Sequence, residues 1–469
     1  MAQQDTADVD EVFQVETHGI DPIPDAERHG SAKDLFWLWF GSNLTFTYVI
    51  NGALAVAFGL SFWQAVAVVV ISGLSFFAVS AAGLSGIRTG TATLVISRAA
   101  FGVRGNFPAG VLNWVVSIGY TIVNTVVGTL ALEVFFAEVG LGSGRFARGL
   151  ALGITLALTF AVAMWGHATV QFAERWMAYL LAAGFGALLV FVLPGAHTSA
   201  TDPAAAPGLS GWSLAFVVML AGPFSYLPMP ADYTRYLPRT TSLKSITWTG
   251  ALGGFISSVA LGIAGVAAAT QTDMTDAVAG AESLLPGWFQ PLFLALVLGG
   301  SVTNSIITLY SSSLNLQVLG IPWSRARAIV ISAAVTALGS LAALFLTDFT
   351  TSLLSFLSLL IIVFAPWGGV FLADMLLRRC HYDSDALHAG SAGAYWYRAG
   401  YHPAGMAALL AGMAFAALIC DSELWTGPLV APLGGADLTL LGSAVSGLVY
   451  WALARGRVPA YAPAAAPAA

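Results

Sequence analysis

The chain has 469 residues, of which 57% are hydrophobic and only 9% are charged, and its formal net charge is −6. An average soluble domain carries about 25% charged residues, so this composition excludes a soluble globular protein. The uncharged apolar stretches reach the roughly 20 residues that a helix needs to span a bilayer. They are continuous rather than alternating, which favours helices over transmembrane strands. The composition therefore predicts an all-α integral membrane protein.

Twelve apolar stretches predict twelve transmembrane helices, spans 1 to 12 in chain order. They cover residues 35–59, 61–83, 107–138, 149–165, 174–193, 211–232, 245–270, 289–315, 326–346, 350–376, 403–421 and 436–454. Residues 1–34 are acidic and polar and carry no signal-peptide pattern, so we expect a solvated cytoplasmic tail. Residues 455–469 include an Ala- and Pro-rich end and are expected to form a disordered tail.

The basic residues lie almost entirely on one side of this topology. With the N-terminus in the cytoplasm, only Arg145 and Arg148 of the 18 lysines and arginines face outward. Because cytoplasmic loops are enriched in Lys and Arg, the bias supports a plasma-membrane protein with both termini inside. The external loops instead carry carboxylates: Asp202, Asp273, Asp276, Glu282, Asp348, Asp421 and Glu423.

Spans 1 and 3 are the first with unusual polar content. Gly41-Ser42-Asn43 interrupts span 1 near its middle, and Asn51-Gly52 follows. In span 3, Asn113, Ser117, Tyr120 and Asn124 are spaced 4, 3 and 4 residues apart, so they share one helix face. Interhelical hydrogen bonding explains most single hydroxyls in such a stripe. Tyr120 beside Asn124, however, suits a flat heteroaromatic ligand, because a ring stacks while an amide pairs with its edge.

Span 6 is interrupted in a similar way, by Gly222-Pro223, Pro228 and Pro230. Such breaks leave backbone N–H and C=O groups without helical hydrogen bonds. In a membrane these groups are tolerated only where they face protein or an aqueous cavity. A simple helix kink is the alternative for one break. Two breaks five spans apart instead indicate two inverted five-helix repeats, with a transporter's binding site at the breaks. Asp232 and Arg235 at the end of span 6 predict a local ion pair or gate.

Span 8 carries the second polar stripe. Its members Ser301, Asn304, Thr308, Ser311 and Asn315 are spaced 3, 4, 3 and 4 residues apart. We expect both stripes to face the interior of the bundle, and Asn124 and Asn304 to contact a ligand. The chain has no Walker A motif, no zinc-protease motif and no His spacing typical of a metal site, so no metal, cofactor or catalysis is expected. Ion-gradient coupling remains by elimination; a membrane receptor or enzyme is the alternative class.

Four stretches resemble the nucleobase–cation symporter family, in its purine–cytosine permease branch. They are VETHGIDPIPDAERHGSAKDLFWLWFGSN, NWVVSIGYTIVNTVVG, ADYTRYLP, and the span 8 pattern Asn304, Tyr310, Ser311 and Gln317. The resemblance extends from about residue 15 to about residue 320. It implies a LeuT-type fold, with repeats over about 35–193 and 211–376 and two trailing helices over about 403–454. It also implies alternating access and import of cytosine or purines with H⁺ or Na⁺, and no role for nucleic acid.

The resemblance also implies roles for individual residues. Asn124 and Asn304 match positions that hydrogen-bond the base, Tyr120 matches a stacking position, and Phe224 is the expected opposite wall. The remaining substrate contacts implied are Ser42, Asn43, Ser225 and Thr308, and the candidate cation ligands are Gly41, Gly299 and Thr303.

Span 8 departs from the family pattern in two places. Ser305, Ile307 and Thr308 replace an Asn, a Pro and an Asn of fungal members, which leaves hydantoin, allantoin, uracil or thiamine open as substrates. Val302 precedes Thr303 where sodium-coupled members have two hydroxyl residues, so proton coupling is favoured.

Overall fold

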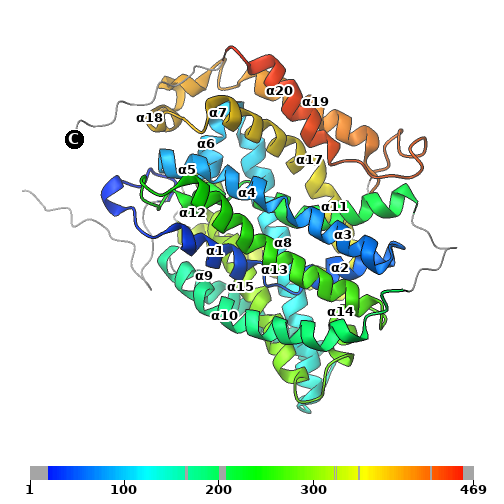
Figure 1. Ribbon diagram of the computed structural model, residues 1–469. Coiled ribbons are helices and arrows are strands. Elements are labelled where there is room, and N and C mark those ends of the chain that lie inside the picture. The colour runs from blue at the N-terminus through cyan, green and yellow to red at the C-terminus, as the bar shows by residue number, and fades with distance from the viewer. Residues whose placement is uncertain are drawn as a thin grey trace, which may run out of the picture.

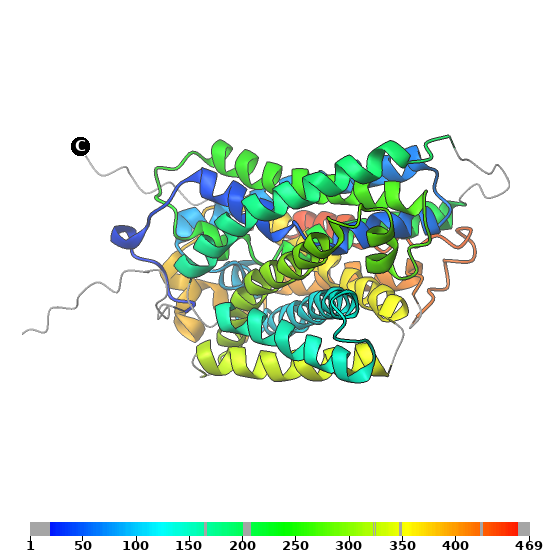
Figure 2. The same cartoon turned by 90° about the horizontal axis from the view of Figure 1, so that it is seen from below.

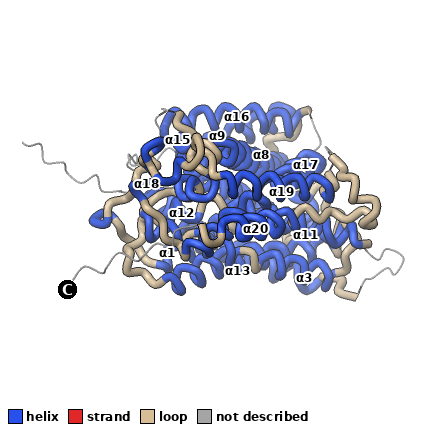
Figure 3. The backbone as a smooth tube through the Cα atoms, turned by 90° about the horizontal axis from the view of Figure 1, so that it is seen from above, coloured by secondary structure: helices blue, strands red, loops and turns tan. Residues whose placement is uncertain are grey.

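The computed structural model describes residues 19–457 apart from 164–166, 200–207, 322, 324, 347–348 and 423–424. Residues 1–18 and 458–469, most of the two predicted tails, lie outside the described residues. Figure 3 shows that helices form almost the whole described chain and that the loops gather toward two opposite ends. The prediction of an all-α membrane protein is confirmed by this architecture and by eight helical stretches long and apolar enough to cross a membrane.

The first predicted repeat is formed by helices α1 to α10 (Figure 1). Their bounds are α1 Ala32–Ser42, α2 Thr47–Ala57, α3 Phe62–Gly73, α4 Phe76–Ala82, α5 Leu84–Thr89, α6 Thr93–Ile96, α7 Arg98–Phe101, α8 Phe107–Glu138, α9 Arg145–Ala163 and α10 His167–Val192, with 3-10 turns η1 Asp25–Glu27 and η2 Leu193–Gly195. Span 1 is the pair α1 and α2, span 2 is the run α3 to α5, and α8, α9 and α10 are spans 3 to 5.

The second predicted repeat and the trailing helices follow the same plan. Their bounds are α11 Leu209–Tyr226, α12 Pro230–Thr234, α13 Leu243–Ala269, α14 Ala277–Ser283, α15 Gln290–Val318, α16 Arg325–Phe345, α17 Phe349–Arg378, α18 Ser384–His388, α19 Pro403–Ile419 and α20 Leu441–Ala454, with 3-10 turns η4 Gly390–Ala392 and η5 Ala394–Trp396. Span 6 is the pair α11 and α12, and α13, α15, α16 and α17 are spans 7 to 10. Spans 11 and 12 are the shorter apolar helices α19 and α20.

The packing of these helices repeats between the two halves of the chain. Span 1 packs against span 7, through α1 and α2 on α13, and span 6 packs against span 2, through α11 on α3. The third spans of the two halves, α8 and α15, pack along each other, and Figure 2 shows the fourth spans, α9 and α16, along one edge of the molecule. Helices α19 and α20 pack on each other and against α17. Matching partners in the two halves are what an inverted repeat requires.

The two ends of the bundle differ in charge. The end with residues 19–31 and the loops before α8 and after α17 carries Arg28, Arg88, Arg98, Arg235 and Arg378, and we call it the basic end. The opposite end carries carboxylates, and we call it the acidic end. Its described carboxylates include Asp273, Asp276, Glu282 and Asp421.

Residues 19–31 pack against the basic end. Ile23 is only 2% exposed, and its backbone N–H donates to the Gly90 carbonyl at 2.9 Å. Arg28 is buried and donates to the Ile87 carbonyl at 2.6 Å. The solvated tail predicted for residues 1–34 therefore does not extend over this segment, because tertiary contacts hold it to the bundle.

Candidate functional site

The break in span 1 is held by its own side chains. Helix α1 ends at Ser42, and Asn43 caps it by donating from Nδ2 to the Trp39 carbonyl at 2.8 Å. The Tyr48 hydroxyl, on α2, donates to Oδ1 of Asn43 at 2.7 Å. A backbone carbonyl at a helix end that is buried without a hydrogen bond destabilises the fold, and a side-chain amide that donates to it removes this penalty. Asn43 therefore stabilises the break.

The break in span 6 faces the break in span 1. Helix α11 ends at Tyr226, and Pro223 inside it removes one backbone donor. The Ser225 hydroxyl donates to the Gly222 carbonyl at 2.6 Å. A Cβ at Gly222 would lie 2.9 Å from the Tyr48 hydroxyl, so glycine lets α11 approach α2 closely at this level.

The two polar stripes, predicted to face the interior of the bundle, meet at the interface between α8 and α15. Near one end, Gly110 of α8 lies against Leu319, which caps the end of α15, and a Cβ at Gly110 would be 2.7 Å from the nearest Leu319 carbon. Further along, Asn124 bonds to Asn304, and Gly128 then lies against Ser301. These contacts fix an antiparallel register over the interface.

Asn124 and Asn304 form a buried amide pair at the centre of this interface. Asn124 donates from Nδ2 to Oδ1 of Asn304 at 2.6 Å. Asn304 donates from Nδ2 to the Ser42 carbonyl and to the Tyr226 hydroxyl, both at 2.6 Å. The amide pair therefore joins α8 and α15 to both breaks.

Two threonines of the span 1 break complete the hydrogen bonding of the amide pair. The hydroxyls of Thr45 and Thr47 donate to Oδ1 of Asn124 at 3.2 and 3.3 Å. Both carbonyl oxygens of the pair are thus occupied by protein donors. A ligand that binds here must exchange its own donors and acceptors for these internal ones.

A small central cavity lies beside the amide pair. Its volume is about 20 Å³, enough for about one water molecule. It is lined by Thr45, Thr47, Tyr48, Asn51, Tyr120, Asn124, Gly222, Ser225, Tyr226 and Asn304. Within the described chain, the Tyr120 hydroxyl and Oδ1 of Asn51 are buried without a hydrogen-bond partner. Unpaired buried polar atoms favour a site that a polar solute completes.

The structure brings together only part of the predicted substrate site. Tyr120, Asn124, Ser225 and Asn304 line the central cavity, and Ser42 contributes its carbonyl to Asn304. Three other predicted contacts do not line it. They are Asn43, which caps α1; Phe224, which is half-buried between two apolar clusters; and Thr308, which donates to the Asn304 carbonyl at 2.9 Å. The binding roles of all these residues stay predictions.

Six cavity residues were not among the predicted contacts. They are Thr45, Thr47, Tyr48, Asn51, Gly222 and Tyr226. The Thr-x-Thr sequence directly after the span 1 break was the available signal for two of them. Tyr226 lies two residues after Phe224 at the span 6 break, and it is the aromatic side chain of that break that lines the cavity.

The candidate cation ligands lie at the contact between the span 1 break and α15. The Thr303 hydroxyl donates to the Gly299 carbonyl at 2.8 Å, and the Gly41 carbonyl accepts from the Leu44 N–H at 3.1 Å. A Cβ at Gly300 would clash with the Leu44 carbonyl, so glycine lets this carbonyl reach α15. The Leu44 carbonyl therefore lies beside these candidate ligands.

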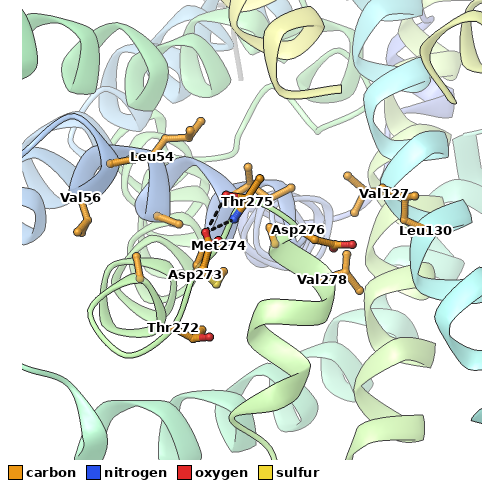
Figure 4. A pocket seen from close by; sticks show the side chains of 15 residues that line it. Leu54, Val56, Val127, Leu130, Thr272, Asp273, Met274, Thr275, Asp276 and Val278 are labelled. Atoms are coloured by element: carbon orange, nitrogen blue, oxygen red, sulfur yellow. Dashed lines mark hydrogen bonds between the residues drawn. The ribbon is translucent and has the colours of Figure 1, made fainter. Parts of the chain in front are cut away.

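A wide vestibule opens at the acidic end (Figure 4). Its volume is about 570 Å³, within the usual range of small-molecule sites. Apolar side chains of α2 and α8 form two walls, and residues 269–278 form the third. In the vestibule, Ile50 is the sequence neighbour of Asn51, and Val127 lies three positions after Asn124. Asn51 and Asn124 both line the central cavity, so the two spaces are close along α2 and α8.

The basic end is closed by a buried polar network. The Asp232 carboxylate accepts from the backbone N–H of Thr93 and from the Ser311 hydroxyl, each at 2.9 Å. Arg235 is fully buried and donates to the Gly19 carbonyl at 2.7 Å and to the Tyr310 hydroxyl at 3.3 Å. We call Asp232, Arg235 and these partners the basic-end seal.

Two solved structures share this fold over almost the whole chain. The nucleobase-cation-symport-1 family transporter Mhp1, closed with bromovinylhydantoin bound, superposes with a TM-score of 0.75 at 19% identity, covering 96% of this chain and 98% of that one. Its inward-facing conformation gives a TM-score of 0.71 at 20% identity, covering 97% of each chain. The LeuT-type arrangement of ten helices in inverted repeats, with two more helices, is confirmed by this similarity.

Sequence relatives point the same way. The putative purine-cytosine permease YxlA of Bacillus subtilis is 26% identical over 95% of this chain and 97% of its own length. The purine-cytosine permease fcyB of Emericella nidulans is 27% identical over 66% of this chain and 62% of its own. The family model described as permease for cytosine/purines, uracil, thiamine, allantoin matches residues 22–440. The chain therefore belongs to this permease family and is a membrane transporter, not an enzyme.

Proposed function

We propose that this transporter imports cytosine and/or purine nucleobases by alternating access. The observation that carries the proposal is the amide pair beside Tyr120 in the central cavity. A nucleobase edge presents N–H donors next to carbonyl or ring-nitrogen acceptors, which matches two amides. The aromatic face of Tyr120 offers a stacking surface for the ring.

Binding in this proposal is an exchange of partners. The base inserts between Asn124 and Asn304, takes over their mutual hydrogen bond and pairs with the free Tyr120 hydroxyl. Because the cavity holds only about 20 Å³, the two breaks must move apart to admit the base. Breaks of this kind let half-helices shift without rearranging the rest of the bundle.

The direction of transport follows from the charge of the two ends. In the proposal the arginine-rich basic end faces the cytoplasm of a plasma membrane, because positive loops stay inside. The vestibule then opens outward and the basic-end seal closes the inner side, which is the state that receives a solute from outside.

We propose H⁺ rather than Na⁺ as the coupling ion. Sodium needs several oxygen ligands, and here the Thr303 hydroxyl is the one side-chain oxygen among the candidate ligands, beside carbonyls such as that of Leu44. Replacing Na⁺ with choline at fixed pH tests this. Undiminished uptake supports proton coupling, and loss of uptake overturns it.

Uptake assays test the substrate. Radiolabelled cytosine and adenine are offered to cells that lack their own permeases, with hydantoin, allantoin, uracil and thiamine as competitors. Saturable accumulation of cytosine or adenine is expected. The proposal fails if neither labelled base accumulates. Uptake of hydantoin, allantoin, uracil or thiamine, each measured in labelled form, then identifies that alternative within the family.

A further inference from the structure

A second pair of amides lies on the same two helices as Asn124 and Asn304. Asn113 precedes Asn124 by 11 residues on α8, and Asn315 follows Asn304 by 11 residues on α15. Eleven helical residues return to nearly the same face after about 16 Å. Because the helices are antiparallel, both shifts point toward the basic end.

The antiparallel register places Asn113 opposite Asn315. The contact between Asn124 and Asn304 lies on one side of them along the interface, and the contact of Gly110 with Leu319 lies on the other. Ser117 and Ser311 occupy the turns between the two amide pairs. The interface therefore repeats its central polar element once, nearer the basic end.

Unlike the first pair, the second pair has side-chain polar atoms without hydrogen-bond partners among the described residues. Asn113 and Asn315 are 0% and 1% exposed. Within the described residues, both polar atoms of the Asn113 amide, Nδ2 of Asn315 and the Ser117 hydroxyl make no hydrogen bond. Amides between membrane helices ordinarily serve to hydrogen-bond the helices together, and these do not. A buried amide with no partner requires an explanation, and a polar solute or water is the simplest one.

The second pair also lies at the level of the basic-end seal, between its contacts. Ser311, one turn before Asn315, bonds to the Asp232 carboxylate of α12. Just beyond Asn315, Gln317 is in contact with the position of Gly19 in the N-terminal segment. Separation of α12 and residues 19–23 from α15 would therefore open this face of the interface toward the basic end.

We propose that Asn113 and Asn315 form an inner station, which binds the amide-like edge of the transported solute after it leaves the central cavity. The inference rests on the proposed function, since it takes the same heterocycle as ligand. An N–H donor and an adjacent acceptor on the solute satisfy the donors and the acceptor left unpaired in the pair. The inner station then contributes to the release of the solute at the basic end and to the binding of solute that enters from that end.

Transport measured from the two sides tests the inner station. The protein is reconstituted in vesicles, and the KM for labelled cytosine or adenine is determined from each face, for wild type, Asn113→Leu, Asn315→Leu and the double variant. We expect the KM from the basic side to rise about tenfold, while the KM from the acidic side changes less than about twofold. Thr336→Val, which removes an unpaired buried hydroxyl on α16, is the matched control and should change neither.

Each other outcome counts against the inner station. Equal changes from both faces, or a fall in melting temperature that accounts for the lost transport, indicate a structural role and overturn it. Unchanged KM from the basic side in the double variant overturns it while the proposed function stands. If wild type transports neither base from either face, the proposed function fails and the inner station fails with it.

Discussion

The acidic and basic ends of this transporter are built differently. At the acidic end, apolar walls of α2 and α8 surround a vestibule of about 570 Å³, and only the narrow central cavity lies beyond it. At the basic end, Asp232 and Arg235 join α12 to α15, to the first residue of α6 and to the N-terminal segment. Apolar surfaces can shift past each other with a small change in free energy, whereas a buried charge that loses its partners destabilises the protein by several kcal/mol, roughly 3–5. The comparison indicates that the basic end presents the larger barrier to opening.

The largest effect is expected where the two ends meet, at the amide pair. Asn304→Ala leaves the Ser42 carbonyl, the Tyr226 hydroxyl and Asn124 without their common partner. We expect uptake to fall about 100-fold or more, and the same for Asn124→Ala, because an unpaired polar site discriminates strongly. Uptake is measured beside surface abundance of each variant. Wild-type apparent affinity in both variants would refute the site.

Loss of the basic-end seal should be the next largest effect. Asp232→Ala removes the acceptor shared by Thr93 and Ser311, so the end should open more often. A reporter cysteine at position 317, in a chain without Cys380 and Cys420, should react with a maleimide about tenfold faster. Asp385→Ala, an exposed carboxylate of α18, is the control. An unchanged labelling rate means that the barrier lies elsewhere.

Filling the vestibule should have a smaller effect. Ala57 is exposed on the wall formed by α2, and Ala57→Trp narrows the approach without touching the central cavity. The uptake rate should fall about threefold through slower association, with an unchanged melting temperature. Leu141→Trp, at an exposed position of the acidic end outside the vestibule, should leave the rate unchanged. Equal losses in the two variants would show that the vestibule is not on the route.

The smallest effect concerns pH at the acidic end. Burial and the neighbouring Glu138 carboxyl raise the pKa of Glu282, on α14, from 4.5 to about 7. Because the pKa of Glu282 is higher in the folded state, its contribution to the free energy of unfolding is fully present below pH 4.5, the pKa of the unfolded state. This contribution is lost as the pH rises through about 7, the pKa of the folded state. The melting temperature should therefore fall by about 1–2 °C between pH 5 and 8, and Glu282→Gln should flatten that fall. Asp421→Asn should keep the wild-type slope.

The sequence predicted those features that depend on residue type along one helix. The lengths of the apolar runs gave the spans. Glycine in span 1 and glycine with proline in span 6 marked the breaks, because these residues act through the local backbone. Asn124 and Asn304 were recognised because amides in an apolar run are rare and share a helix face with other polar residues.

Features that depend on contacts between distant segments were not predictable in this way. Asn43 was predicted as a substrate contact from its place in the break, and its hydrogen bonds to the Trp39 carbonyl and the Tyr48 hydroxyl appear only in the folded break. The acidic N-terminal stretch suggested solvent, yet Arg28 reaches a carbonyl of span 2 and holds it in place. Phe224 and Tyr226 are both aromatic, and only the crossing of α11 with α15 decides which one meets Asn304.

The self-pairing of Asn124 with Asn304 has a consequence for the empty carrier. A permease that works by symport must return to its starting state without cargo, and an empty polar site inside a membrane would resist that step or fill with a file of water. If the amide pair binds the base as proposed, the hydrogen bond from Asn124 to Asn304 at 2.6 Å takes the place of the missing solute. In that proposal the unloaded protein closes its centre with its own hydrogen bond and returns without cargo. Solutes that offer fewer hydrogen bonds than an amide then compete poorly with the protein's own pair.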